Sequence, residues 1–185
     1  MRLHIPEGWD QLVDRIVDDA GNRAVVLLDG GSGAGKSTLA AQLAITLMPR
    51  LGKMQLITMD ELYAGWEGLA AGSRILADDV LDPDAPGYRR WDWELGRRDN
   101  RVHLDPKRPL LVEGCGALTT VTARKATTSL WLELDAVSRR RRALDRDGEL
   151  FHPWWERWAA QEQEHWRVNA PQQLADLVLT GQTTD

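Results

Sequence analysis

Residues 24–38 read AVVLLDGGSGAGKST, in which an apolar run leads directly into a loop rich in glycine. The segment from Gly30 to Ser37 matches the pattern G-x-x-x-x-G-K-S, which binds phosphate groups in proteins that use nucleoside triphosphates. Glycines allow the backbone of such a loop to turn its N–H groups inward around phosphate oxygens. The apolar run before the loop and the helical run LAAQLAITLM after it form the context that the motif requires. The alternative is a chance glycine-rich turn, and the context favours a nucleoside triphosphate site.

The parts of this loop have distinct expected roles. The Lys36 side chain can reach the β- and γ-phosphates, which makes it a candidate catalytic residue, and the Ser37 hydroxyl can ligate Mg²⁺. The helix that begins at Lys36 adds the positive end of its dipole to the same anion. We therefore expect the chain to bind ATP and Mg²⁺. The loop residues expected to hold the triphosphate are Gly31, Ser32, Gly33, Ala34, Gly35, Lys36, Ser37 and Thr38.

Length and composition exclude several classes of protein. A chain of 185 residues suits one domain with a full hydrophobic core. The net charge of −5 argues against a nucleic-acid backbone as the main partner, because that role needs a basic surface. No apolar run approaches the roughly 20 residues of a membrane span, so we expect no membrane partner. The single cysteine, Cys115, fits a reducing compartment, and we expect a cytoplasmic protein, with a homo-oligomer left open.

Apolar and amphipathic segments alternate along the chain as they do in layered α/β domains. This alternation predicts a parallel sheet of about five strands with helices on both faces. Together with the phosphate loop and an arginine run near residue 140, it leads us to expect a three-layer P-loop NTPase fold with an arginine-rich lid. We expect one domain over 1–185, in which 1–22 form a helical lead-in and 136–166 form the lid and the helix after it. The expected strands are 23–29, 54–59, 109–113, 129–134 and 177–179, and the expected helices are 9–20, 36–48, 69–81, 138–147 and 153–165.

Acidic residues follow two of the expected strands, at the sheet edge where ligands of such folds bind. Asp60 comes directly after strand 54–59 and is a candidate base that positions and deprotonates an acceptor hydroxyl. The alternatives for Asp60 are a cap of the next segment or a Mg²⁺ ligand. Glu113 ends strand 109–113 and suits the second position of a Mg²⁺ site, acting through water. A carboxylate that is simply solvated is the alternative there.

Four consecutive arginines, Arg139–Arg142, together with Arg146 give the expected helix 138–147 an unusual charge density. At about 100° per residue, Arg139, Arg142 and Arg146 share one face of the helix. Guanidinium groups on one face repel one another unless anions lie between them, and phosphates are the obvious anions here. We therefore expect a lid in which Arg139 and Arg142 bind ATP, and in which Arg142 and Arg146 act in catalysis. A purely solvated basic face is the alternative.

Tryptophan occurs nine times, against one phenylalanine and two tyrosines, so its placement needs an explanation. Trp155, Trp158 and Trp166 share one helical face with Glu162, which indicates core packing unless one ring stacks on a ligand. Trp91 lies instead in a polar, arginine-rich stretch beside a carboxylate, which suits a planar or sugar-like acceptor. We place the acceptor site between Asp60, Tyr63, Trp66, Trp91 and Asp92, with Arg97 as a further candidate.

These motifs together resemble the uridine kinase branch of the P-loop kinases, which also holds the pantothenate kinases and phosphoribulokinases. The resemblance covers about residues 23–180. DGGSGAGKST is similar to that family's phosphate loop, MDELY at 59–63 to its D-x-F-Y motif, and LVEG at 111–114 to its E-G motif. The resemblance implies that Asp60 activates the acceptor, that Tyr63 lines the substrate site and that Glu113 serves Mg²⁺.

Two further segments extend the resemblance, and a third departs from it. RRWDWELGRR at 89–98 is similar to the segment that contacts the acceptor, which implies that role for Trp91, Asp92 and Arg97. LDAVSRRRRALDRD at 134–147 is similar to the lid helix, which implies phosphate contacts for the three arginines of its common face. The loop AGWEGLAAG at 64–72 lacks the H-P-x-A segment that holds the ribose in uridine kinases. The resemblance therefore implies ATP-dependent phosphorylation but not the identity of the acceptor.

Three functions stay open at this point. The first is a kinase that phosphorylates a hydroxyl of a nucleoside-like small molecule. The second is a kinase whose acceptor already carries a phosphate, such as a nucleoside monophosphate, which Arg89, Arg90, Arg97 and Arg98 could bind. The third is a nucleotide-sensing NTPase without an acceptor. The sequence lacks the N-K-x-D motif of GTPases and the L-S-G-G-Q signature of transporter ATPases, and its lid arginines with Asp60 favour transfer.

Overall fold

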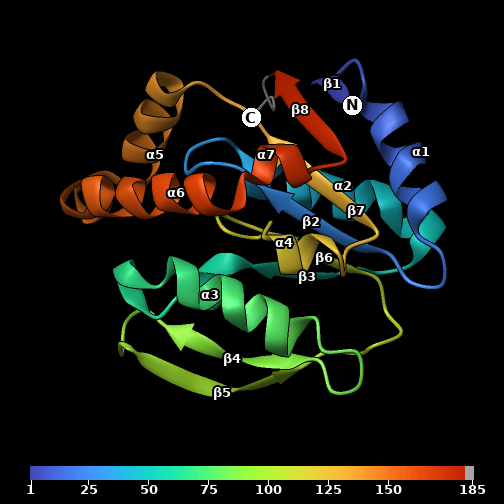
Figure 1. Ribbon diagram of the computed structural model, residues 1–185, viewed down its shortest axis with the longest axis horizontal. Coiled ribbons are helices and arrows are strands. Elements are labelled where there is room, and N and C mark those ends of the chain that lie inside the picture. The colour runs from blue at the N-terminus through green and yellow to red at the C-terminus, as the bar shows by residue number, and fades with distance from the viewer. Residues whose placement is uncertain (182–185) are drawn as a thin grey trace.

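A parallel sheet covered by helices on both faces forms the centre of the protein (Figure 1). The computed structural model describes residues 1–181, except the side chains of residues 146, 147 and 149–151. The strand order is β1-β8-β7-β2-β6-β3, and each neighbouring pair runs parallel. This is the three-layer α/β architecture that the alternating pattern predicts. The strands are β1 (Arg2–Ile5), β2 (Val25–Asp29), β3 (Gln55–Thr58), β6 (Leu110–Glu113), β7 (Thr128–Leu132) and β8 (Leu177–Gly181).

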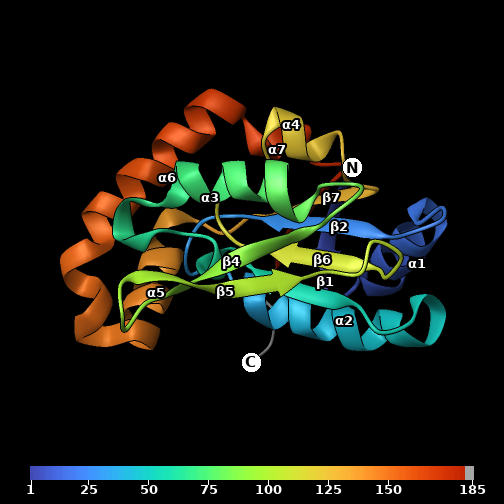
Figure 2. The same cartoon turned by 90° about the horizontal axis from the view of Figure 1, so that it is seen from below.

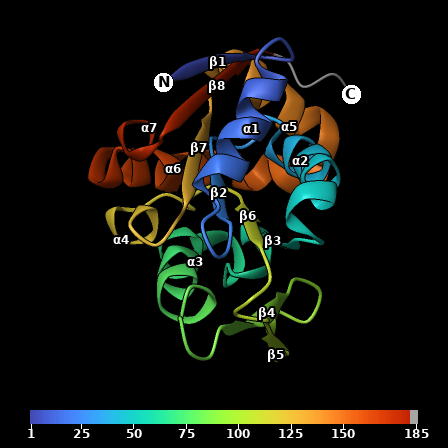
Figure 3. The same cartoon turned by 90° about the vertical axis from the view of Figure 1, so that its right-hand side faces the viewer.

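Helices close both faces of this sheet, and Figure 3 shows them on opposite sides of the strands. α1 and α2 pack on one face, where they share a core with Val26 and Leu28 of β2. α3 and α6 pack on the other face, around Val25 and Leu27. Because both faces of β2 are covered, all five of its residues are buried, which explains its apolar run. The helices are α1 (Trp9–Asp19), α2 (Lys36–Leu51), α3 (Leu69–Ile75), α4 (Thr120–Ala123), α5 (Ala136–Phe151), α6 (Trp155–Asn169) and α7 (Pro171–Leu174).

The sheet has six strands rather than about five, because residues 2–5 form a strand that the apolar pattern does not reveal. β1 pairs in parallel with β8, with Leu3 opposite Leu179. Leu3 and Ile5 are buried, whereas Arg2 and His4 are exposed. Four residues with two exposed basic side chains are too short and too polar to stand out from the sequence. The expected helical lead-in over 1–22 therefore contains an edge strand as well as α1.

A second departure from the expected elements is the antiparallel hairpin of β4 (Gly87–Asp92) and β5 (Arg97–His103). The two strands form a small sheet of their own and lie beside α3 in Figures 1 and 2. Most of their residues are at least partly exposed, and many are arginines, so no apolar alternation marks them. Tyr88 and Val102 anchor the hairpin to the core that α3 and α6 share.

The ends of two helices differ from the expected ones. α2 continues through Pro49 to Leu51 and is capped by Gly52, whose φ is 81° and whose N–H donates to the Met48 carbonyl at 2.9 Å. The glycine, and not the proline, therefore ends the helix. The expected helix 69–81 is α3 followed by a π-helical turn, Leu76–Val80.

Within residues 1–181, none of the helices combines the length and the apolar character of a membrane span. Short 3₁₀ turns occur at Met59–Glu61, Gly65–Glu67 and His152–Trp154.

Candidate active site

The phosphate loop leaves β2 at Asp29 and ends where α2 begins at Lys36. Gly33 has a φ of 79° and Gly35 a φ of 98°, both in the left-handed region that favours glycine. No side chain caps the N-terminus of α2 at Gly35. The first N–H groups of the helix, at the positive end of its dipole, are therefore available to bind a ligand. Ser37 and Thr38, the second and third residues of α2, are exposed in its first turn. The backbone here suits an anion with several oxygens.

Lys36 is buried at the start of α2 rather than exposed on the loop. Its Nζ donates to the Gly31 carbonyl at 3.0 Å and contacts Cys115 Sγ at 3.5 Å. Burial alone lowers the pKa of Lys36, but the surrounding acidic groups, among them the carboxylates of Glu113, Glu162 and Asp29, outweigh burial and raise it in sum. The ammonium group is thus held in its charged form beside the loop, where it can neutralise phosphate.

Ser37 and Glu113 bring two oxygen-bearing side chains together beside the phosphate loop. The Ser37 hydroxyl donates to Glu113 Oε1 at 2.9 Å. Glu113 is the last residue of β6, is 5% exposed, and lies opposite Leu28 of β2. Mg²⁺ prefers hard oxygen ligands and keeps several waters, so one hydroxyl and one carboxylate beside a phosphate loop fit it. The residues present therefore suit Mg²⁺ bound together with a nucleotide.

Asp60 lies at the same edge of the sheet, on the far side of Glu113 from the phosphate loop. In the sheet, Thr58 of β3 pairs with Glu113 of β6, and Asp60 follows two residues later in a 3₁₀ turn. The Asp60 side chain is exposed. The backbone carbonyl of Asp60 accepts a hydrogen bond from Trp93 Nε1 at 2.9 Å. The strand register thus brings the phosphate loop, the Glu113 carboxylate and the exposed Asp60 side chain to one edge.

Arg139, which belongs to the expected lid helix, packs directly against the phosphate loop. It is 9% exposed and donates to the Ser32 carbonyl at 3.2 Å and to Glu162 Oε2 at 3.4 Å. Its guanidinium carbon lies 5.2 Å from the centre of the Trp166 ring. A methyl group at Gly31 would come within 2.1 Å of the guanidinium group, so glycine is required for this approach. Arg139 therefore joins the loop to α6.

The other arginines of α5 differ in burial. Arg142 is half-buried, whereas Arg140 and Arg141 are exposed, which agrees with a division between one inner and one outer face. The side chain of Arg146, which we expect to act in catalysis, lies outside the described residues. Only Arg139 among the described lid arginines contacts the loop directly.

Tyr63 belongs to the core, and its position does not agree with a residue that lines an acceptor site. The side chain is 1% exposed, and its hydroxyl donates to the Cys115 carbonyl at 2.6 Å. The Tyr63 and Trp158 rings meet edge to face, with ring centres 4.8 Å apart. Burial raises the pKa of the hydroxyl well above its usual value. Tyr63 is therefore a buried core residue whose hydroxyl has a hydrogen-bond partner, and it packs behind the site against Cys115 and Trp158.

Trp66 and Trp91, which we place together in the expected acceptor site, take separate partners. Trp66 lies parallel to Trp154, with ring centres 5.7 Å apart and planes at 8°. It also contacts Trp93, with ring centres 5.1 Å apart. Trp91 carries the Arg98 guanidinium group over its ring at 5.4 Å. Trp66, Trp93 and Trp154 therefore form one cluster, which we call the aromatic wall, and Trp91 stands apart from it.

Asp92 and the arginines of the hairpin are largely used in holding the hairpin. Asp92 Oδ1 accepts hydrogen bonds from the N–H groups of Glu94 and Leu95, which fixes the turn between β4 and β5. Arg98 donates to the Leu62 carbonyl at 2.8 Å, and so it reaches the turn after β3 in place of Arg97. Arg97 is exposed and pairs with Asp92 across the hairpin.

The remaining hairpin arginines also have partners. Arg90 forms an ion pair with Glu61 at 2.9 Å, and Arg89 donates to the Asp99 carbonyl at 3.0 Å. Of the four arginines that could bind an acceptor phosphate, Arg89, Arg90 and Arg98 are thus engaged within the protein.

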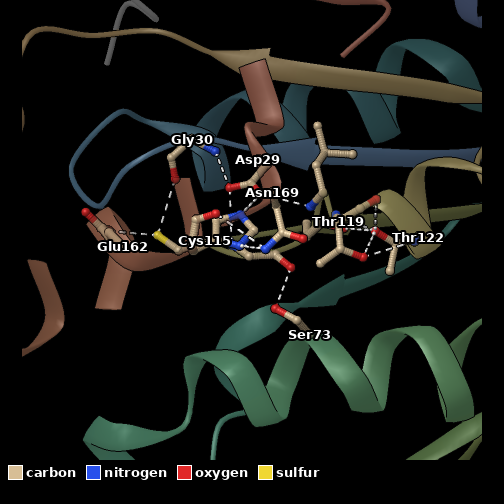
Figure 4. A network of polar contacts seen from close by, with 12 residues as sticks. Asp29, Gly30, Ser73, Cys115, Thr119, Thr122, Glu162 and Asn169 are labelled. Carbon is tan, nitrogen blue, oxygen red and sulfur yellow. Dashed lines mark hydrogen bonds and ion pairs between the residues drawn. The ribbon is translucent and has the colours of Figure 1, made fainter. Parts of the chain in front are cut away.

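Two residues of the site, Asp29 and Glu162, have roles that the sequence patterns do not predict. Asp29 is completely buried and binds backbone N–H groups at the start of the phosphate loop (Figure 4). Glu162 is 2% exposed and accepts hydrogen bonds from the Ser32 N–H at 2.7 Å and from Cys115 Sγ at 3.0 Å. The available signal is a polar residue on the buried, tryptophan-rich face of α6, because buried carboxylates need donors.

A cavity of about 340 Å³ opens beside the phosphate loop on the α6 and α7 side. Trp131 and Trp166 meet edge to face in its wall, with ring centres 6.0 Å apart. The cavity has aromatic walls, one cationic side chain (Arg139) and one acidic side chain (Glu133), and it touches the loop at Gly31. Its lining includes Gly31, Trp131, Leu134, Arg139, Trp166 and Pro171.

Comparison with solved structures identifies the fold. A candidate fructose transport system kinase from Silicibacter sp. TM1040 has a TM-score of 0.57 and 17% identity, over 91% of this chain and 97% of that one. A candidate uridine kinase from Bacillus stearothermophilus has a TM-score of 0.58 and 18% identity, over 91% and 99%. The YGR205w protein has a TM-score of 0.51 and 15% identity, over 95% and 91%. The chain has the fold of the P-loop kinases.

This P-loop kinase fold covers nearly the whole chain, and it agrees with the resemblance that the sequence motifs indicate. No model of a known protein family matches the sequence, and no curated protein matches it. At identities below one fifth, the similarity concerns the arrangement of helices and strands. What the site does chemically must therefore be argued from its own residues.

Proposed function

We propose that this protein is an ATP-dependent kinase that transfers the γ-phosphate to a hydroxyl group of a nucleoside-like small molecule in the cytoplasm. The observation that carries the proposal is the meeting of three groups at one sheet edge: the buried Lys36, the Ser37–Glu113 pair and the exposed Asp60. Phosphoryl transfer needs alignment and charge neutralisation more than covalent chemistry by the protein. These three groups supply both.

On the nucleotide side, the loop backbone and Lys36 would bind the β- and γ-phosphates of ATP. Ser37 and Glu113 would hold Mg²⁺, which supplies charge neutralisation for the phosphates when bound. Arg139 would approach the triphosphate from the Ser32 side of the loop, with Arg142 as a second cation. The cavity beside Gly31, with its indole rings, is the place where we expect the nucleoside part of ATP.

On the acceptor side, Asp60 would orient the acceptor hydroxyl and take its proton. The acceptor oxygen then bonds to the γ-phosphorus while the bond from that phosphorus to ADP breaks. An exposed carboxylate at a strand end can approach a substrate without loss of core packing. The aromatic wall of Trp66, Trp93 and Trp154 lies next to it through the Trp93–Asp60 hydrogen bond and offers a surface for a flat ring.

The test is a transfer assay with labelled ATP and a panel of nucleosides, nucleoside monophosphates and simple sugar alcohols. We expect one or more nucleoside-like hydroxyl compounds to become labelled, and Asp60→Asn to abolish the labelling. Labelling of monophosphates alone would assign the protein to the second class of kinases. Release of phosphate that is independent of every acceptor and of Asp60 would contradict the proposal and favour an NTPase.

A further inference from the structure

Asp29 joins two segments of the site through a buried carboxylate. Its Oδ1 accepts hydrogen bonds from the N–H groups of Gly30 at 2.7 Å and Gly116 at 3.2 Å, and its Oδ2 accepts one from Leu118 at 2.8 Å (Figure 4). Gly30 opens the phosphate loop, and Gly116 lies just beyond Glu113 in the chain. One side chain thus ties the phosphate loop to the segment that follows the Mg²⁺ carboxylate.

His165 of α6 completes this arrangement from the other face of Asp29. Its Nε2 lies 3.1 Å from Asp29 Oδ2, and its Nδ1 lies 3.1 Å from the Asn169 amide nitrogen. The amide donates to Nδ1, so the ring hydrogen lies on Nε2 and is donated to Asp29. The His165 and Asp29 side chains are 3% and 0% exposed. Loss of this donor would therefore leave part of a buried carboxylate unsatisfied.

The same face of α6 also holds the outer part of the loop. Glu162 accepts from the Ser32 N–H at 2.7 Å, and Trp158 Nε1 donates to Ser32 Oγ at 2.9 Å. Trp158, Glu162 and His165 are spaced by four and three residues, which places them on one side of the helix. α6 therefore contacts the loop at its start and at Ser32, and fixes both as one body.

We propose that His165, acting through Asp29, is a positioning residue that sets the phosphate loop against Glu113. The inference rests on the proposed function, because it takes Ser37 and Glu113 as the ligands of Mg²⁺. These two ligands come from different segments, and Asp29 with His165 joins the segments behind the site. A displacement of about 1 Å between reacting groups can cost on the order of 10²-fold in rate, so this spacing matters.

The experiment compares His165→Leu, which removes the donor, with His165→Gln, whose amide nitrogen can donate from the same position. ATP binding is measured by calorimetry with EDTA and with increasing Mg²⁺. We expect His165→Leu to raise the Mg²⁺ concentration for half-maximal binding about tenfold, the effect of one lost hydrogen bond to a charged group. His165→Gln and the exposed control His103→Leu should stay within about twofold of the wild type.

The measurement with EDTA separates positioning from general support. A purely structural role predicts equal weakening of ATP binding with and without Mg²⁺, and that result would overturn the proposal. An unchanged Mg²⁺ requirement in His165→Leu would overturn it as well. If His165→Leu does not fold, Asn169→Leu, which leaves the imidazole free to turn, is judged by the same criteria.

The two proposals fail in different ways. A wild-type protein that binds ATP with Mg²⁺ but phosphorylates no acceptor refutes the kinase activity and leaves the positioning role standing, because its readout is binding. A wild-type protein whose ATP binding does not depend on Mg²⁺ overturns the positioning role, whatever the transfer assay gives.

Discussion

The two sides of the candidate site are held in different ways. On the nucleotide side, Lys36, Glu113, Asp29 and Glu162 are all buried, and most of their polar atoms contact backbone or side chains of another element. On the acceptor side, Asp60 is exposed and Trp93 is 41% exposed, and a two-stranded hairpin supports them. The first region is part of the core, and the second lies upon it.

This difference follows from what each side has to bind. A triphosphate carries a dense negative charge on a flexible chain, so a rigid arrangement of donors binds it with the least cost in ordering the protein. An acceptor has to enter, be enclosed and leave as a product, which requires surfaces that can move. We therefore expect substitutions on the nucleotide side to affect ATP binding and stability together. Substitutions on the acceptor side should affect turnover or the acceptor KM and leave ATP binding unchanged.

The largest effect should come from Asp60→Asn. Because the Asp60 side chain is exposed, the variant should fold and bind ATP as the wild type does, while kcat falls by roughly 10²–10⁴-fold, the contribution of a general base. Steady-state rates and ATP titrations on the same preparation measure both quantities. Asp92→Asn, which alters a turn residue, is the matched control and should lose far less. A parallel loss of Mg²⁺-dependent ATP binding would instead assign Asp60 to the metal site.

Lys36→Met should reduce transfer on the order of 10²-fold or more, because it removes a charge that neutralises phosphate. Since Lys36 is buried among carboxylates, we also expect the melting temperature to fall, unlike that of Asp60→Asn. Thermal unfolding and the transfer assay are compared with those of Lys53→Met, an exposed lysine. A fully active Lys36→Met protein would show that phosphate transfer takes place elsewhere.

Arg139→Ala should weaken ATP binding by about tenfold or more, because it removes charge-assisted contacts at the loop. Arg140→Ala, one position along the same helix but exposed, should have little effect. Nucleotide titration of the two variants decides whether α5 acts through one inner face. Equal losses at both positions would indicate a diffuse basic surface.

Trp66→Ala should raise the acceptor KM by about tenfold and leave the KM for ATP nearly unchanged, because base–indole stacking contributes about 1–3 kcal/mol. Trp91→Ala tests the separate position of that ring and should have a smaller effect, since Trp91 already carries Arg98. If Trp66→Ala unfolds or raises both KM values together, the aromatic wall is structural and the acceptor binds elsewhere.

The smallest effect concerns Cys115. Burial, aided by Glu162, raises the pKa of its thiol above that of an exposed cysteine, so the thiolate is scarce in the native protein. Iodoacetamide at about pH 8 should therefore modify the native protein slowly and the unfolded protein quickly. The unfolded chain releases the thiol proton near pH 8.5, whereas the folded protein keeps it to a higher pH. The contribution of Cys115 to the free energy of unfolding is therefore complete below about pH 8.5 and declines as the pH rises further.

The sequence predicts the nucleotide side of the fold well, because the signals there are local. A buried strand, a glycine loop and an amphipathic helix follow one another between residues 24 and 51, and the strand-end rule brings Glu113 and Asp60 to the same edge. The hairpin and β1 are harder to predict, because short exposed strands leave no apolar pattern. Nine tryptophans offer many pairings, so the sequence could not show that Trp66 takes Trp154 and Trp93 instead of Trp91.

The roles of Asp29 and His165 depend on contacts across the whole chain. Nothing in the spacing of either residue points to the other, since the partners belong to different elements. The polar positions on the inner face of α6 indicate only that they need partners inside the protein. Which partners they find is decided by the packing of α6 against the carboxyl edge of β2.

The supports of the phosphate loop also bear on how the chain folds. Ser32 lies 126 residues from Trp158 and 130 from Glu162, and Asp29 lies 136 residues from His165. Contacts of such separation close large loops of chain and form slowly. During synthesis, the strand, loop and first large helix emerge long before the helix that braces them. We therefore expect the phosphate loop to reach its final, braced form late in folding, so that the proposed nucleotide binding would report on the completeness of folding.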